Sequence, residues 1–195
     1  MVPQIRLYTA TEVVPLWRVT ETWLAERGLN VPFWSVPWAG GQALARYLFD
    51  HPERVCGKRV VDFGAGSGLL AIAAAMLGAR HVRALDVDPT ANAACLLNAS
   101  ENGVTIEASC EDVVDTAITP DVLLAGDIWY ELGPSARFAR WMRELAAGGV
   151  EVLTGDPGRA YVPSGHRELA VYDVQTSAEL ESMSSRRARV VQIGV

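Results

Sequence analysis

The chain has 195 residues, of which 50% are hydrophobic, and its formal net charge is −6. This composition excludes a disordered chain and supplies enough apolar residues for one domain with a full core. The longest uncharged apolar run, Leu69 to Ala79, is too short to span a membrane. No secretory signal is visible, and the three cysteines are odd in number and unevenly spaced, so we expect reduced thiols in the cytoplasm and no metal site.

Basic residues are scattered along the chain. Their densest cluster is Arg186, Arg187 and Arg189, which we interpret as a solvated turn before the last strand. An enzyme that acts on nucleic acid usually presents a basic face. The charge pattern therefore disfavours a nucleic-acid substrate.

Helices and an aromatic loop are predicted in the first part of the chain. Apolar residues recur at helical spacing between Glu12 and Arg27. An aromatic loop from Val31 to Gly41 follows, and a second helix is predicted from about Gln42 to Asp50. We expect residues 1–57 to form an N-terminal helical cap on a core of residues 58–195, within a single domain.

The segment from Val60 to Gly68 reads Val-Val-Asp-Phe-Gly-Ala-Gly-Ser-Gly. A strand, a tight turn with Gly64, Gly66 and Gly68, and an apolar helix open a nucleotide-binding βαβ unit. The carboxylate of Asp62 would repel a pyrophosphate, but it suits a cofactor that carries an ammonium and a sulfonium. The loop therefore favours S-adenosylmethionine (SAM), and with it a methyltransferase.

From Arg59 onward strands and helices alternate, which indicates an α/β fold with a mostly parallel sheet and helices on both faces. The predicted parallel strands are Arg59–Asp62, Val82–Asp86, Val104–Ala108, Val122–Gly126 and Val150–Leu153, and the predicted helices are Leu69–Leu77, Pro89–Asn102 and Ser135–Ala147. Two β-rich runs, Glu168–Gln175 and Arg189–Ile193, predict an antiparallel hairpin at the edge. Seven strands in this order are the Rossmann-like architecture of SAM-dependent methyltransferases, here without the usual helix between strands five and six.

Two acids after predicted strands complete the expected cofactor site. Asp86 ends the second strand, where a carboxylate accepts hydrogen bonds from two ribose hydroxyls. A solvent-exposed acid is the alternative. Asp112 follows the third strand and is expected to accept from the amino group of the adenine; capping of a short helix is the alternative.

The segment from Asp127 to Glu131 follows strand four and is expected to face the methyl group, because ligands lie beyond the carboxyl ends of parallel strands. We predict Asp127 and Tyr130 as catalytic residues. Asp127 would hold an ammonium, orient the amine and contact the cofactor, and aromatic walls would favour a cation and lower its pKa by desolvation. The other predicted contacts are Trp129, Glu131 and Trp34 to the substrate and Trp38 to the cofactor. Core packing is the alternative for Trp129, and packing of the cap onto the sheet is the alternative for the aromatic loop.

These residues together resemble the seven-strand protein-lysine methyltransferases that carry an Asp-x-x-Tyr motif after strand four. Within that family the chain is most similar to the electron transfer flavoprotein β-subunit lysine methyltransferases. The motifs that carry the similarity are Pro3–Leu7, Pro32–Trp34, Trp38–Leu48, Asp86–Pro89, Gly126–Tyr130 and Gly155–Arg159. The resemblance implies SAM as the donor, lysines of the flavoprotein β-subunit as acceptors, and Asp127 as the residue that positions the lysine. Trp129 departs from the phenylalanine expected before Tyr130.

We therefore predict a SAM-dependent protein-lysine N-methyltransferase that acts on the electron transfer flavoprotein β-subunit, with neither a nucleic-acid nor a membrane partner. The alternatives are a small-molecule N-methyltransferase of the nicotinamide kind, a ribosomal-protein methyltransferase and a non-catalytic SAM-binding subunit. A protein substrate needs an open entrance, whereas a small molecule needs an enclosed pocket. The short loop from Gly155 to Gly165 favours the open form, and intact Asp127 and Tyr130 argue against a non-catalytic subunit.

Overall fold

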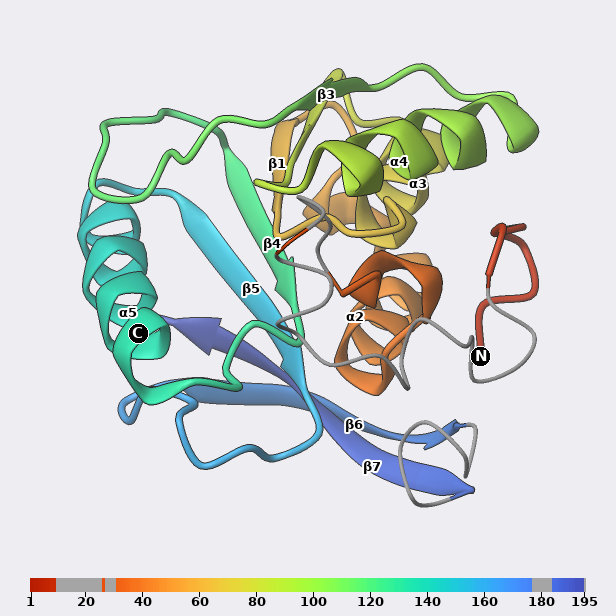
Figure 1. Cartoon of the computed structure of the whole chain (residues 1–195). Coiled ribbons are helices and arrows are strands. Elements are labelled where there is room, and N and C mark those ends of the chain that lie inside the picture. The colour runs from red at the N-terminus through yellow and green to blue at the C-terminus, as the bar shows by residue number, and fades with distance from the viewer. Residues whose placement is uncertain (10–25, 27–30, 177–183, 195) are drawn as a thin grey trace.

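The computed structural model describes residues 1–9, 26, 31–176 and 184–194. These residues contain a seven-stranded sheet of order β3-β2-β1-β4-β5-β7-β6 with helices on both faces (Figure 1). The first five strands of the chain run parallel, and β7 is antiparallel to both β5 and β6. The strands are β1 Arg59–Phe63, β2 His81–Leu85, β3 Glu107–Ser109, β4 Val122–Gly126, β5 Glu151–Asp156, β6 Arg167–Gln175 and β7 Ser185–Ile193. The predicted fold class, with its antiparallel hairpin at one edge, is confirmed.

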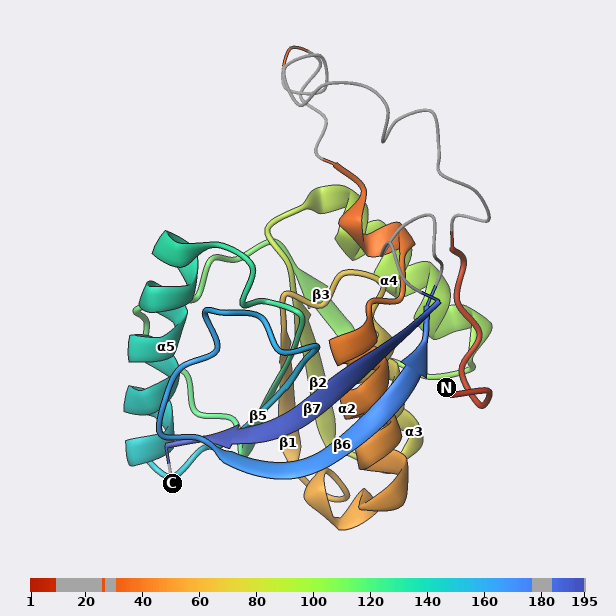
Figure 2. The ribbon, with the colours of Figure 1, turned by 90° about the horizontal axis from the view of Figure 1, so that it is seen from below.

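Two helical layers enclose the sheet, and Figure 2 shows it between α5 on one side and α2, α3 and α4 on the other. The helices are α2 Ala39–Asp50, α3 Leu69–Met76, α4 Pro89–Glu101 and α5 Leu132–Ala147, with short 3-10 turns η2 Phe33–Ser35 and η3 Pro52–Arg54. Successive strand side chains point to opposite faces, so Val60 packs in the cluster with α2 and α3 while Val61 packs in the cluster with α5. Both faces of the parallel strands are therefore apolar, as in the continuous hydrophobic runs of the sequence.

The site of ligand binding follows from the strand order. Because β1 pairs with β2 on one side and with β4 on the other, the chain changes direction across the sheet at β1. Such a switch point leaves a crevice beyond the carboxyl ends of the strands. The ends of β1, β2 and β4 meet there.

The third strand begins later than the predicted Val104. The first residues after α4 close the helix instead: Gly103 has a φ of 66° and the N–H of Val104 donates to the carbonyl of Ala99 at 3.1 Å. The N–H of Val104 is therefore bonded to the end of the helix and cannot pair with a neighbouring strand. The strand accordingly begins at Glu107.

The arginine cluster near the C-terminus lies in a strand, so its interpretation as a solvated turn is wrong. Arg187 pairs with Asp173 of β6, and Arg189 pairs with Val171 of β6 and Asp156 of β5. Ala188, between Arg187 and Arg189, and Val190, directly after Arg189, are buried. The alternation of arginine with small apolar residues is a period-two strand pattern.

The first part of the chain differs from a simple cap. Helix α2 packs against β5, β7 and α3, so it belongs to one helical layer of the sheet. The predicted helix Glu12–Arg27 lies outside the described residues, apart from Glu26. Residues 1–9 run beside α4, where the N–H of Arg6 donates to Asn102 and the N–H of Tyr8 donates to Asn98.

The connection from β5 to β6 contains no helix, as predicted. Among the helices that the structure describes, none is both long and apolar enough to cross a membrane.

Candidate functional site

A cavity of about 1160 Å³ opens beyond the carboxyl ends of β1, β2 and β4. Its walls come from the aromatic segment 31–38, the glycine loop, the segments that follow β2, β3 and β4, the start of α5, and Arg159 from the loop after β5. A smaller hollow of about 60 Å³ is lined by some of the same segments together with Asp62 and Gly41. The cavity therefore lies at the switch point of the sheet.

The three glycines of the loop have different structural roles. All have positive φ, which residues with a Cβ adopt only at a cost. Gly64 and Gly66 line the cavity. Gly68 does not, and a Cβ there would lie 2.5 Å from the Sγ of Cys95 on α4. Gly68 therefore has a packing role, in which the absent side chain lets α3 and α4 approach each other, and its cofactor contact stays a prediction.

Asp86 holds the glycine loop from its place at the end of β2. Its two carboxylate oxygens accept from the N–H of Gly66 at 2.9 Å and from the N–H of Asp88 at 3.0 Å. Burial raises the pKa of this carboxyl. Each oxygen keeps a further lone pair, so Asp86 could also accept from ribose hydroxyls in the cavity.

Asp62 places a buried carboxylate beside the smaller hollow. Its Oδ2 accepts from the N–H of Ala71 at 2.9 Å, whereas its Oδ1 is buried without a hydrogen-bond partner. Burial raises the pKa of Asp62 to about 7. An unpartnered buried carboxylate oxygen is costly unless a donor or a cation completes it. The acid and the open glycine backbone therefore fit the ammonium and sulfonium of SAM.

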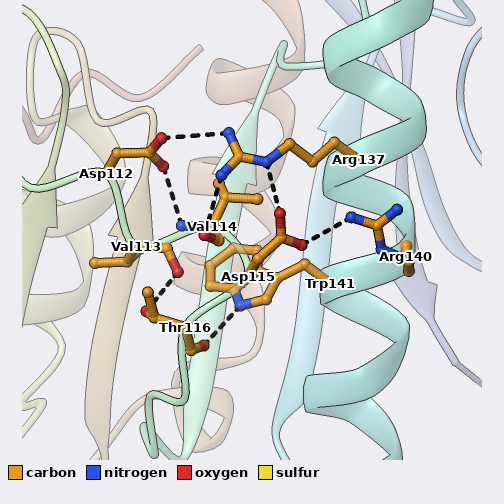
Figure 3. A network of polar contacts seen from close by, with 8 residues as sticks. All are labelled: Asp112, Val113, Val114, Asp115, Thr116, Arg137, Arg140 and Trp141. Carbon is orange, nitrogen blue, oxygen red and sulfur yellow. Dashed lines mark hydrogen bonds and ion pairs between the residues drawn. The ribbon is translucent and has the colours of Figure 1, made fainter.

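Asp112 lines the cavity, as predicted, but its carboxylate also organises the loop after β3 (Figure 3). One oxygen accepts from the N–H of Val114 at 3.1 Å and the other from Arg137 of α5 at 3.3 Å. Arg137 also donates to Asp115 at 2.7 Å and to the carbonyl of Val114 at 3.1 Å. The sequence analysis did not single out Arg137, which fastens this wall of the cavity to α5.

Asp127 is held in a specific geometry directly after β4. Its φ of 58° is left-handed, and its N–H donates to the carbonyl of Gly155 at 2.9 Å. Its carboxylate accepts from the N–H of Gly41 at 2.7 Å and from Arg159 at 2.8 Å. Burial raises the pKa of Asp127 to about 6, although Arg159 and the Gly41 N–H act in the opposite direction.

A backbone crossing brings Gly41 to Asp127. A Cβ on Gly40 would lie 2.3 Å from the carbonyl oxygen of Gly155, and a Cβ on Gly155 would lie 2.0 Å from the carbonyl oxygen of Gly40. A Cβ on Gly126 would lie 2.8 Å from the Cα of Gly41. Glycines at these positions therefore let the first turn of α2 pack directly on the ends of β4 and β5. The Trp-Ala-Gly-Gly and Gly-Asp-Pro-Gly-Arg motifs were the available signal for this contact.

Aromatic side chains gather around the cavity mouth. The ring of Phe33 lies 6.4 Å from the rings of both Tyr130 and Trp38, measured between centroids. The indole N–H of Trp34 donates to Thr90 at the start of α4. The structure brings Trp34, Trp38 and Tyr130 together in the lining, as the sequence analysis predicted.

Two predicted substrate contacts do not line the cavity. Trp129 is wholly buried in the core beneath α5, and its indole N–H donates to Thr154 at 3.3 Å. The prediction for Trp129 is therefore wrong, because its side chain points to the opposite side from Tyr130. Glu131 is exposed and precedes α5 as its N-cap residue, outside the lining.

The sheet order, the glycine loop and the buried acids at the switch point define a SAM-dependent methyltransferase. The family model described as "Ribosomal protein L11 methyltransferase (PrmA)" matches residues 47–128. Over 191 residues the chain is 36% identical to the electron transfer flavoprotein beta subunit lysine methyltransferase of Xenopus laevis, covering 93% of this chain and 76% of that one. The chain therefore belongs to the family of electron transfer flavoprotein β-subunit lysine methyltransferases.

Other comparisons agree with this assignment. The relative of the same name from Rattus norvegicus is 37% identical over 170 residues, covering 85% of this chain and 65% of that one. The solved magnesium protoporphyrin IX methyltransferase (ChlM) of Synechocystis PCC 6803, with bound SAM, has a TM-score of 0.56 at 19% identity and covers 78% of this chain and 77% of that chain. That structural likeness concerns the fold. SAM is the cofactor of this enzyme.

Proposed function

We propose that this enzyme methylates lysine side chains of the electron transfer flavoprotein β-subunit, the substrate in the names of its relatives. The observation that carries the proposal is the carboxylate of Asp127, whose side chain is only 8% exposed and lines a cavity with exposed aromatic residues at its mouth. A buried acid with aromatic neighbours suits an ammonium. This chemistry is that of a lysine acceptor.

The cofactor end of the cavity is proposed to consist of Asp62, Asp86, Gly64 and Gly66. Asp86 would accept from the ribose, Asp112 would lie beside the adenine, and the unpartnered oxygen of Asp62 would accept from the ammonium. Bound SAM supplies a methyl group activated by a sulfonium.

The acceptor end is proposed to consist of Asp127 and Tyr130, with Phe33, Trp34 and Trp38 as walls. A lysine amine has an unperturbed pKa of about 10.4 and must lose a proton before its lone pair can react. Desolvation between aromatic rings lowers that pKa. Asp127 would hold the amine and orient its lone pair toward the methyl group, so that proximity and orientation accelerate the transfer.

The entrance supports a protein acceptor. Three large apolar side chains of the cavity lining are exposed, Phe33 (52%), Val87 (68%) and Tyr130 (56%), and so is Leu132 (67%), which directly precedes the lining residue Gly133. We call these four residues the mouth rim. An exposed apolar cluster beside a cavity that holds acids is typical of a protein-binding surface, and a small acceptor would gain little from it.

The charge of the lining supports a cationic acceptor. Acids outnumber bases there: the acids are Asp86, Asp88, Glu111, Asp112 and Asp127, and the bases are Arg137 and Arg159. Both bases are paired with acids of the same lining, Arg137 with Asp112 and Arg159 with Asp127. The remaining negative charge would attract a lysine-bearing surface and repel nucleic acid.

We also propose that the enzyme works in the cytoplasm, since Cys56, Cys95 and Cys110 are all free thiols. Residues 1–57 and 58–195 are proposed to act as one domain, an assignment supported by the packing of α2 on β5 and β7.

The test is parallel incubation with methyl-labelled SAM, followed by mass spectrometry. The acceptors are the folded flavoprotein β-subunit, ribosomal protein L11 and nicotinamide. We expect methylated lysine on the β-subunit and no label on nicotinamide. Labelled nicotinamide or L11 with an unmodified β-subunit would overturn the proposed acceptor.

A further inference from the structure

Arg159 lies between two buried carboxylates beside the cavity. Its Nη1 donates to Asp127 at 2.8 Å and to Asp156 at 3.1 Å. The side chains of these acids are only 8% and 3% exposed, and that of Arg159 is 27% exposed. One guanidinium therefore serves two carboxylates that water hardly reaches.

The turn after β5 is built to present this arginine. The other oxygen of Asp156 accepts from the N–H groups of Gly158 at 2.7 Å and Arg159 at 2.6 Å. Gly158 has a φ of 91°, which turns the chain back toward the cavity. Asp156 thus shapes the loop through one oxygen and binds the guanidinium of Arg159 through the other.

We propose that Arg159 is a positioning residue for methyl transfer, which fixes the carboxylate of Asp127 toward the acceptor amine. This inference rests on the proposed function, in which the acceptor is an amine. The carboxylate has two other constraints, the left-handed backbone of Asp127 and the N–H of Gly41. Arg159 supplies the only one of these contacts that carries a charge.

The ion pair with Arg159 also affects the protonation state of Asp127. The charge of Asp156 on β5 acts on Asp127, and α2 supplies the N–H of Gly41. Asp127 also lines the smaller hollow together with Asp62 of β1, and the cavity together with Tyr130. Burial and the neighbouring Asp156 favour the protonated form of Asp127, and Arg159 opposes them. Without the guanidinium, Asp127 would take up a proton at a higher pH and could no longer hold an ammonium.

A buried ion network of this kind is weak evidence for stability. Its place beside the cavity is better explained if Arg159 sets the charge and the orientation of Asp127. A charged residue that only stabilised the loop would change the unfolding midpoint when removed, but it would not change the pH dependence of the reaction.

The test compares Arg159→Met and Arg159→Lys with the wild type, using kcat and KM for the protein acceptor between about pH 6 and pH 9. Arg143→Met is the matched control, because Arg143 donates to the carbonyl of Ser164 in the same connection and does not touch Asp127. For Arg159→Met we expect a kcat at least about tenfold lower at neutral pH and an acidic limb shifted upward by at least about one pH unit. Arg159→Lys should recover part of both effects, and Arg143→Met should match the wild type. An unchanged pH profile in Arg159→Met would overturn the inference.

A second measurement separates this inference from the choice of acceptor. The side-chain carboxyl of Asp127 is titrated by carbon-13 NMR in the wild type and in Arg159→Met, with Asp127→Asn to assign the signal. We expect an upward shift of the pKa of Asp127 when Arg159 is removed. An unmodified β-subunit in the wild-type assay would overturn the proposed function, whereas an unchanged titration of Asp127 would overturn the role of Arg159.

Discussion

At the residue scale, two buried acids are the cation sites that we propose, Asp62 beside the smaller hollow and Asp127 in the cavity. Asp62 and Asp127 both have a pKa raised by burial, to about 7 and about 6. They differ in their partners: Asp62 has an oxygen without a partner, whereas both oxygens of Asp127 are bound by protein donors. The first site is therefore incomplete in the free protein, and the second is already oriented.

The incomplete site predicts that SAM affinity depends on pH. Free Asp62 takes up a proton as the pH falls below about 7, and a bound cation favours its ionised form. SAM binding should thus release a proton and weaken as the pH falls through 7, by up to about tenfold per pH unit. Titration calorimetry at about pH 6, 7 and 8, in buffers of different ionisation heat, measures the effect.

Asp62→Asn is the control for this prediction, because an amide in that place keeps the shape but does not titrate. Its SAM affinity should be low and nearly constant over the same range. A wild-type dissociation constant that does not change with pH would contradict the role of Asp62.

The same raised pKa predicts how the stability of the free protein changes with pH. The folded state of Asp62 binds a proton more tightly than the unfolded state does, so its contribution is present below the unfolded pKa of about 4 and is lost as the pH rises through about 7. Urea unfolding of the free protein should therefore show a decrease in stability between about pH 5 and pH 8 that is smaller in Asp62→Asn. An equal decrease in both proteins would assign the effect to other groups.

Asp127→Asn should separate binding from chemistry. The amide keeps the shape of the side chain, but it loses the charge that holds an ammonium. We expect near-normal SAM affinity and a methyl-transfer rate at least about tenfold lower, which is about 1.4 kcal/mol of barrier. Calorimetry and single-turnover labelling measure the two quantities, and full transfer activity in this variant would exclude the proposed role.

At the scale of elements, the stability of the fold should depend on the close backbone contact between Gly40 of α2 and Gly155 of β5. A Cβ at residue 155 would lie 2.0 Å from a backbone oxygen, so Gly155→Ala forces two backbones apart. Overpacking of this kind costs about 1–3 kcal/mol and should lower the unfolding midpoint. Thermal and urea unfolding measure the change.

Gly133→Ala is the matched control for the crossing. Gly133 lies in α5 with no atom within 4 Å of an added Cβ, so alanine there should be neutral or should stabilise the helix by up to about 1 kcal/mol. Equal stability of the two variants would show that the crossing is not tight.

The elements themselves were largely predictable, because hydrophobic periodicity is local. Strand β4 lies at the predicted Val122–Gly126, and α5 also ends at the predicted Ala147. The misplaced elements have physical reasons: the closure of α4 delays β3, and the arginines of β7 lie on a strand whose alternate residues are buried. A charge cluster is an unreliable sign of a turn when small apolar residues separate its members.

The site was predictable where it depends on the ends of strands. Asp86, Asp112 and Asp127 lie on one cavity because parallel strands end at the same edge. Arg159 was missed because its contact with Asp127 depends on the turn after β5, which no periodicity describes. Trp129 was misassigned because one residue of sequence decides whether a side chain after a strand faces the cavity or the core.

At the scale of the whole molecule, the mouth rim predicts where the protein acceptor docks. Leu132 is 67% exposed between the lining residues Tyr130 and Gly133 in the chain, whereas Leu97 is 62% exposed on α4, six residues beyond the lining residue Ala91. If the β-subunit contacts the rim, Leu132→Gln should raise the KM for that protein by at least about threefold, since it removes apolar area from the interface. SAM affinity should stay unchanged. Leu97→Gln makes the same chemical change on a matched residue and should leave both constants unchanged.

The negative charge of the lining predicts that the same contact also depends on ionic strength. Attraction between it and a lysine-bearing partner is screened by salt, so the KM for the β-subunit should rise with ionic strength in the wild type and in Leu132→Gln alike. The apolar contribution of the rim should persist at high salt. Steady-state kinetics at low and high salt therefore separate the two contributions. Equal KM values for Leu132→Gln, Leu97→Gln and the wild type at both salt concentrations would place the docking surface on another part of the molecule, while the cavity and its acids would remain the site of transfer.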